Sequence, residues 1–113
     1  MFDKSSWNEI PSGSPMEGVS RQLFYGKNIM LARIESEKGA TLKKHSHHHE
    51  QMVYNVEGEM KFVIGNDGEE TEIVLKAGDV LLIPSNVPHG TVALTDKVLA
   101  FDIFSPIRED FLK

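Results

Sequence analysis

Short apolar runs separated by turn residues are the feature that most limits the fold of this sequence. They show no helical periodicity and cover residues 21–26, 28–36, 40–47, 51–65, 70–78, 79–85, 90–94 and 97–104. Valine, isoleucine and phenylalanine fill them, as in half-buried strands. Between them lie turn signals, among which the GNDG segment at 65–68 strongly indicates a hairpin, because Gly and Asn tolerate positive φ. The pattern predicts an all-β sandwich or barrel.

Length and charge narrow the class of protein further. A chain of 113 residues is long enough for a single domain. Its net charge of -5 disfavours nucleic-acid binding, which needs a clustered basic surface. The N-terminus lacks the pattern of a signal peptide, and no apolar stretch approaches the ~20 residues that span a bilayer. We therefore expect a cytoplasmic protein that binds neither nucleic acid nor membranes.

Residues 1–20 differ in composition from the remainder of the chain. They are rich in serine, proline and glycine and have no alternating apolar pattern, which predicts an irregular N-terminal arm. Phe2 and Trp7 are its expected apolar anchors. Residues 21–113 then form the β domain, including a C-terminal strand and tail.

Four of the five histidines lie within the segment HSHHH, residues 45–49. A purification-tag remnant is one interpretation, but tags are terminal, whereas this run stands between two strand-like segments. Alternate residues of a strand share a face, so His45 and His47 project together with Lys43. Two imidazoles on one face can bind a single metal ion from adjacent directions. The spacing therefore indicates the first half of a metal site.

Two motifs make the sequence resemble the cupin family. The first cupin motif is Gly-x5-His-x-His-x3–4-Glu/Gln-x6-Gly, and it is matched by Gly39, His45, His47, Gln51 and Gly58. The second is Gly-x5-Pro-x-Gly-x2-His, and it is matched by Gly78, Pro84 and His89. Asn86 stands where this second motif has its inner glycine, and asparagine tolerates the same left-handed turn geometry.

The resemblance implies a double-stranded β-helix (jelly-roll) barrel with a divalent metal ion inside. Cupins hold the ion with three histidines and one acidic or amide residue, which here implies His45, His47, Gln51 and His89. We expect His48 to face solvent and His49 to support the ligands rather than bind the ion. Small cupins are commonly dimers, so we expect a homodimer, with the N-terminal arm as a candidate contact.

Gln51 is the informative departure from the usual cupin pattern, which has Glu at this position. All four implied ligands are then neutral, so the ion keeps its full charge and attracts an anionic substrate more strongly. The same residue weakens the case for oxygen chemistry, because non-haem Fe(II) oxygenases commonly use a carboxylate ligand. Imidazole suits several divalent ions, so Zn, Ni, Fe, Mn and Cu all stay open.

The C-terminal strand carries an acidic residue among apolar ones. Strand alternation places Asp102 on one face with three apolar residues, Val98, Ala100 and Phe104. Asp102 could face solvent or cap a turn, but both faces of the strand are apolar, which favours partial burial, and buried carboxylates often mark sites. Arg108 is the cation within reach, unless it forms an exposed pair with the acids that follow it.

With the closing segment DIFSPIREDFL, residues 102–112, the sequence resembles the KdgF type of cupin from Trp7 to Leu112. This resemblance implies conversion of 4,5-unsaturated monouronates from pectin or alginate breakdown into linear keto acids. It implicates Asp102 in proton transfer, Phe104 in packing against the sugar ring and Arg108 in binding the substrate carboxylate. Lys43 is a second candidate for the carboxylate, although most lysines are solvated.

Two other functions stay open from the sequence alone. A metal-dependent dioxygenase of small molecules would use the same metal ligands, and a non-catalytic sugar-binding cupin would use the same cavity. We favour an isomerase-type enzyme that acts on a small anionic sugar acid.

Overall fold

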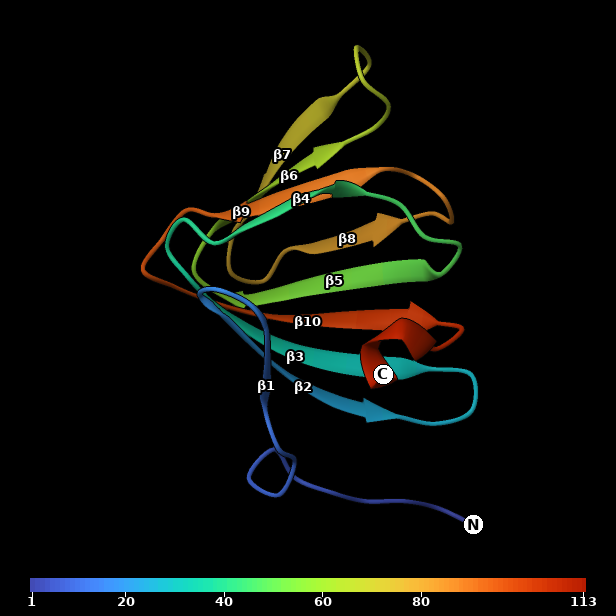
Figure 1. Ribbon diagram of the computed structural model, residues 1–113. Helices are drawn as coiled ribbons and strands as arrows, with labels where there is room; N and C mark the ends of the chain where they lie inside the picture. Colours follow the sequence, from blue (N-terminus) through green and yellow to red (C-terminus); the bar gives the residue numbers. More distant parts are fainter.

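The computed structural model describes residues 1–113 and consists almost entirely of β-strands (Figure 1). The elements are β1 (Gly13–Met16), β2 (Val19–Tyr25), β3 (Met30–Glu37), β4 (Thr41–His45), β5 (Glu50–Glu57), β6 (Met60–Ile64), β7 (Thr71–Leu75), β8 (Val80–Ile83), β9 (His89–Ala93), β10 (Lys97–Ser105) and the 3-10 helix η1 (Glu109–Leu112). Each predicted run overlaps a strand, and the GNDG turn joins β6 to β7. The all-β class is confirmed. No helix of the structure is long and apolar enough to cross a membrane.

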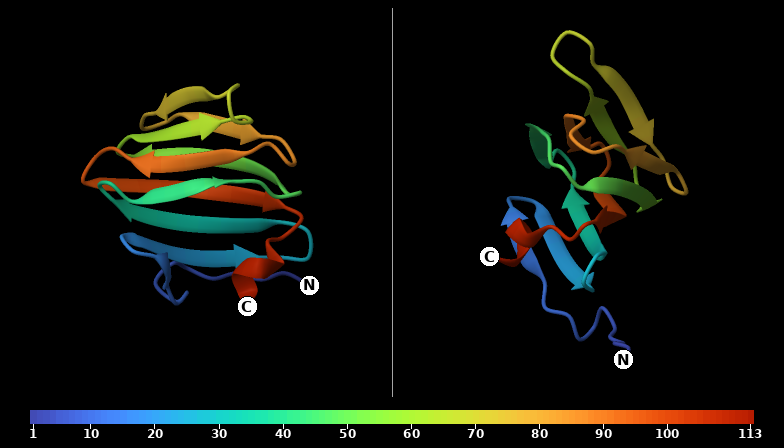
Figure 2. Two further views of the ribbon diagram at one scale, coloured as in Figure 1. Left: turned by 45° about the horizontal axis from the view of Figure 1, so that its top comes forward. Right: turned by 90° about the vertical axis from the view of Figure 1, so that its right-hand side faces the viewer.

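The strands form two antiparallel sheets that face each other. One sheet has the order β1-β2-β3-β10-β5-β8, and the other has the order β4-β9-β6-β7. From β3 to β6, and again from β7 to β10, each strand is followed by one in the opposite sheet. Figure 2 shows the resulting two-layered barrel from two further sides. This is the double-stranded β-helix that the resemblance to cupins implied.

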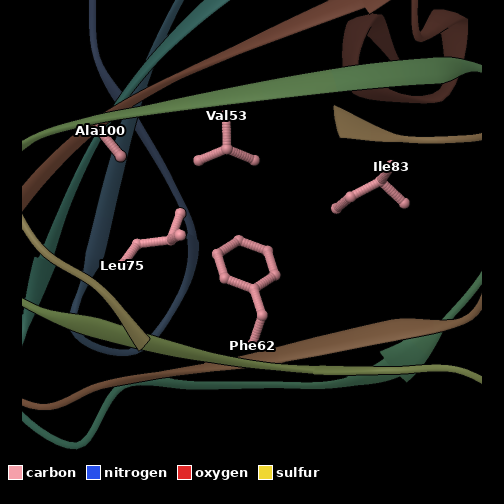
Figure 3. Packing of buried hydrophobic residues seen from close by; sticks show 5 residues of the cluster. All are labelled: Val53, Phe62, Leu75, Ile83 and Ala100. Carbon is pink, nitrogen blue, oxygen red and sulfur yellow. The ribbon is translucent and has the colours of Figure 1, made fainter. Parts of the chain in front are cut away.

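The buried hydrophobic residues form two clusters, of which the smaller consists of Met30, Ala32 and Phe104 on β3 and β10, and the larger lies between the two sheets on the side of β7. Val53, Ile83 and Ala100 point from the six-stranded sheet toward Phe62 and Leu75 of the four-stranded sheet (Figure 3). The exposed fraction of each of these side chains is at most 4%. Burying a side chain as large as valine, leucine or phenylalanine contributes about 1.5–3 kcal/mol. These contacts therefore hold the two sheets together and fix the barrel walls around the site described below.

The N-terminal arm is more ordered than its composition predicted. Gly13–Met16 form β1, which pairs with β2 at the edge of the larger sheet. An edge strand accommodates Pro15, because one side of it needs no N–H donor. Trp7 packs against Phe101 with ring centroids 5.9 Å apart, as an anchor should. The prediction for Phe2 is wrong, because its side chain is 86% exposed where the chain runs out beyond the sheet.

We predict that Phe62→Ala lowers the free energy of unfolding by about 3–5 kcal/mol, because it leaves a cavity between the sheets. Urea denaturation followed by fluorescence or circular dichroism measures the change. Val80→Ala serves as the control, because Val80 is 73% exposed and surface substitutions usually stay within about 0.5 kcal/mol. Equal losses in the two variants would contradict the assigned core.

Candidate metal centre and cavity

The crossing from one sheet to the other brings the candidate ligands together. Strand β4 ends at His45 in the smaller sheet and β5 begins in the larger one, so residues 46–49 pass between the sheets at one end of the barrel (Figure 1). His89 is the first residue of β9 and lies directly opposite His45. Gln51 lies on β5 opposite Phe104 of β10. Both sheets therefore contribute to one site.

Backbone geometry in the second motif supports this arrangement. Asn86 has a φ of 65°, the left-handed conformation expected at the position where cupins usually have glycine. The Asn86 amide nitrogen donates to the His47 carbonyl oxygen at 2.8 Å. The turn before His89 is thus tied to the segment that carries His47, which holds the two motifs in fixed positions relative to each other.

The three histidines present their ligand nitrogens to a common point. These nitrogens of His45, His47 and His89 all lie within 4.8 Å of one another. In each ring Nδ1 lies within hydrogen-bonding distance of a backbone carbonyl oxygen: Lys43 O at 3.0 Å, His49 O at 3.1 Å and Val87 O at 3.0 Å, respectively. A carbonyl only accepts, so Nδ1 carries the proton and Nε2 has a free lone pair. This is how protein backbones usually orient metal-binding imidazoles.

Gln51 connects the histidine cluster to Asp102. Burial raises the pKa of Asp102, and the Gln51 side chain opposes this by favouring the ionised carboxylate, as an amide N–H beside a carboxylate does. The amide oxygen of Gln51 then lies 3.1 Å from Nε2 of His47. Two atoms with lone pairs, and no proton between them, therefore face each other. Two facing lone pairs can both bind a cation. The nitrogen and oxygen atoms of this site therefore fit a metal ion.

Burial favours the neutral form of two of these imidazoles, His47 and His89. It lowers the pKa of His47 to about 4, with additional effects from the positive charge of Arg108 and from His89. Burial likewise lowers the pKa of His89. Because metal ligation requires the neutral ring, few protons compete for these two ligand positions near neutral pH.

The remaining residues of the histidine segment lie where the sequence predicted. His48 is exposed, and so is Lys43, which agrees with the solvated interpretation of that lysine. His49 is 7% exposed and does not belong to the three-histidine cluster. Its ring lies 5.3 Å from that of His47, and burial lowers its pKa against the opposing effect of the Ile107 backbone. His49 therefore supports the site and links it to the C-terminal segment.

A cavity of about 250 Å³ extends from the histidines into the barrel. Its lining includes the predicted ligands His45, Gln51 and His89, the predicted catalytic residues Asp102, Phe104 and Arg108, and two residues that the sequence analysis missed, Arg21 and Phe111.

Asp102 is the only acidic residue that lines the cavity. Burial raises the pKa of Asp102 to about 7, against the opposing effects of Gln51, Arg108 and Arg21. Val98 and Ala100 share its face, as strand alternation predicted.

Arg108 pairs with an acid that follows it, which is one of the two alternatives that the sequence left open, but its side chain is buried rather than exposed. We expected it to be either the partner of Asp102 or part of an exposed pair. Its side chain instead is buried and binds Asp110, through Nε to Oδ1 at 3.1 Å and through Nη2 to Oδ2 at 2.9 Å. The short 3-10 turn of η1 places the Asp110 carboxylate beside the guanidinium, while Asp102 forms no ion pair with Arg108 and is affected only by its charge. One edge of the Arg108 guanidinium is therefore already occupied.

Arg21 and Phe111 complete the wall of the cavity at this end. The Arg21 guanidinium lies 3.9 Å from the centre of the Phe111 ring, and that of Arg108 lies 4.2 Å from it. Strand alternation could have found Arg21, because it shares a face with the apolar Val19 and Leu23. No local pattern predicts Phe111, because its position depends on how the tail folds back over the barrel.

Comparison with known proteins places the chain in a family. The cupin domain model matches residues 32–104. The pectin degradation protein KdgF of Dickeya dadantii is 32% identical over 112 residues, which cover 97% of this chain and 94% of that protein. The chain is a KdgF-type cupin.

Solved structures agree with this assignment. KdgF from Halomonas sp. superposes with a TM-score of 0.82 at 29% identity, over 94% of this chain and 96% of that one. An RmlC-like cupin from Shewanella frigidimarina has a TM-score of 0.81 at 35% identity, over 95% and 93% of the two chains. Together with the three-histidine cluster, these similarities identify a metal-dependent cupin.

We predict that His89→Ala lowers metal affinity by more than about 100-fold. Replacing a residue that only supports a metal ligand already lowers metal affinity by about 10- to 100-fold, and a ligand should matter more. Elemental analysis after dialysis against a weak chelator measures the bound metal. His48→Ala is the matched control, since His48 is exposed and lies outside the cluster. Full metal content in His89→Ala would remove His89 from the ligand set.

Proposed function

We propose that this KdgF-type cupin converts 4,5-unsaturated monouronates into linear keto acids. The observation that carries the proposal is Asp102, the single acidic residue in a cavity that also holds a three-histidine metal centre and two arginines. Similarity to a pectin degradation protein over nearly the whole chain supports this class of substrate. His45, His47, His89 and Gln51 would hold a divalent ion, which when bound supplies a Lewis acid for the substrate oxygens.

The charges of the cavity suit an acidic sugar. Arg21 and Arg108 are the positive groups, and all four candidate metal ligands are neutral. Asp110 offsets one arginine through its two hydrogen bonds. Even with Asp102 ionised, Arg21 and the divalent ion leave the site positive, so a carboxylate ligand is attracted to it.

The reaction requires one proton to leave and one to arrive. In the ring form of the substrate, C1 carries a hydroxyl group and C4 is joined to C5 by a double bond. When the bond between C1 and the ring oxygen breaks, the C1 hydroxyl loses its proton and becomes an aldehyde, and the ring oxygen stays on C5 as an enolate. Addition of a proton at C4 then gives the ketone, with no atom gained or lost overall.

Asp102 is our candidate for the proton at C4. A carboxyl with a pKa of about 7 is divided between its acid and base forms near neutral pH, which suits general acid–base catalysis. The Gln51 side chain, whose oxygen faces Nε2 of His47, favours the ionised form of this carboxyl and so links it to the candidate ligands. Phe104, buried beside it, excludes water and offers an apolar surface to the sugar ring.

Loss of the ultraviolet absorbance of a 4,5-unsaturated monouronate tests the proposal. We predict that metal-loaded protein accelerates the loss, because the double bond conjugated to the carboxylate disappears as the ketone forms. Oxygen is not a reactant, so the rate should be equal in strictly anaerobic buffer. A decay rate unchanged by the protein would refute the proposed function, and a strict need for oxygen would favour a dioxygenase.

Asp102→Asn retains the shape of the side chain but removes its ability to transfer a proton. We predict a fall in kcat of roughly 10²- to 10⁴-fold, the usual contribution of general acid–base catalysis, with metal content near that of the unaltered protein. Asp96→Asn is the control, because Asp96 is exposed in the turn before β10. If Asp102→Asn loses its metal, Asp102 stabilises the metal ligands and is not shown to transfer a proton.

A further inference from the structure

Arg21 is the one arginine of the chain without an acidic partner. The chain has three arginines, of which Arg33 bonds Glu35 and Arg108 bonds Asp110. No hydrogen bond or ion pair of the structure involves the Arg21 side chain, although its guanidinium carries five N–H donors. These donors line the cavity without a protein acceptor and are therefore free to bind an incoming anion.

Its place in the fold directs Arg21 into the cavity. On β2 it lies opposite Ile34 of β3, and both residues line the cavity. The next pair along these strands, Gln22 and Arg33, belongs to the outer face of the same sheet. The two arginines are thus near neighbours that point to opposite sides, one toward the site and one away from it.

Arg108 is a second cation close to Arg21, and its presence strengthens the case that an anion binds at Arg21. Arg21 and Arg108 both lie against the Phe111 ring, at 3.9 and 4.2 Å from its centre. After burial, the charge of Arg108 is the main cause of the lowered pKa of Arg21. Only Arg108 has its charge balanced by a paired acid, Asp110. The unbalanced charge of the pair therefore resides at Arg21.

We propose that Arg21, rather than Arg108 alone, binds the carboxylate of the sugar acid and so determines that the ligand must be a uronate. This assignment rests on the proposed function in one respect, which is that the bound anion is a sugar acid. Arg108 then contributes its unoccupied edge, while its other edge stays bound to Asp110. A guanidinium binds a carboxylate through two parallel hydrogen bonds, which a neutral sugar cannot accept.

Paired titrations with galacturonate and galactose test this assignment, since the two sugars differ in the carboxylate. Using zinc-loaded protein and calorimetry, we predict that Arg21→Gln weakens galacturonate binding by about 10- to 100-fold, the worth of charge-assisted hydrogen bonds, and leaves galactose binding unchanged. With the unsaturated monouronate, KM should rise in parallel while kcat changes little. Arg33→Gln is the matched control: it removes the same charge from the outer face and should alter neither affinity nor KM.

The alternative role for Arg21 is purely structural, as a stacking partner that holds Phe111 and η1 in place. Phe111→Leu removes the ring but leaves the charge, and Arg21→Lys keeps the charge but loses the stack. We predict that both retain the preference for galacturonate over galactose, and that only Arg21→Gln abolishes it. Equal losses for the two sugars in Arg21→Gln and Phe111→Leu would overturn the inference in favour of the structural role.

The outcomes separate this inference from the proposed function. If the unaltered protein converts the unsaturated uronate and Arg21→Gln does so with an unchanged KM, the assignment of Arg21 is wrong and the proposed function stands. If no conversion occurs but galacturonate binding still depends on Arg21, the proposed function is wrong and the uronate-binding role of Arg21 stands. Should Arg21→Gln lose its folded thermal transition, loss of the galacturonate preference in Arg21→Lys would equally refute the assignment.

Discussion

The side-chain amide of Gln51 is the contact on which the site depends. Its oxygen lies 3.1 Å from Nε2 of His47, and its side chain favours the ionised form of Asp102, so one rigid group links the candidate ligands to the single acid of the cavity. A glutamate at this position would provide no donor for Asp102 and would place two carboxyl groups side by side. The amide therefore serves both halves of the site, and the position of Asp102 follows from the position of the ligands.

Charge distribution follows from the same residue. With neutral ligands the divalent ion keeps its charge, and two arginines add to it at the other side of the cavity. The fold tolerates this excess because Asp110 pairs with Arg108, and because the Phe111 ring lies against both guanidiniums. The anionic sugar acid that we propose as ligand would offset this positive charge, and it would connect the metal centre and the arginines in one physical account.

Much of the fold and of the metal centre could be predicted from sequence, because both depend on local order. Period-two alternation gave the strands and the inward face of Asp102, and motif spacing gave three histidines that the structure brings together. The failures involve residues whose surroundings come from distant parts of the chain. Arg108 pairs with Asp110 at a 3-10 turn and is buried, which no pattern signals. Arg21 meets Phe111 across 90 positions only through the folded tail. The strand β1 likewise forms because β2 offers a free edge, which the composition of residues 1–20 does not reveal.

A crystal structure of the metal-loaded protein would test the central claim most directly. The account predicts that the ion is bound by Nε2 of His45, His47 and His89 and by the amide oxygen of Gln51, with the Gln51 nitrogen still donating to Asp102. Coordination through Nδ1 of any of these histidines, or a Gln51 amide turned away from either the ion or Asp102, would contradict it.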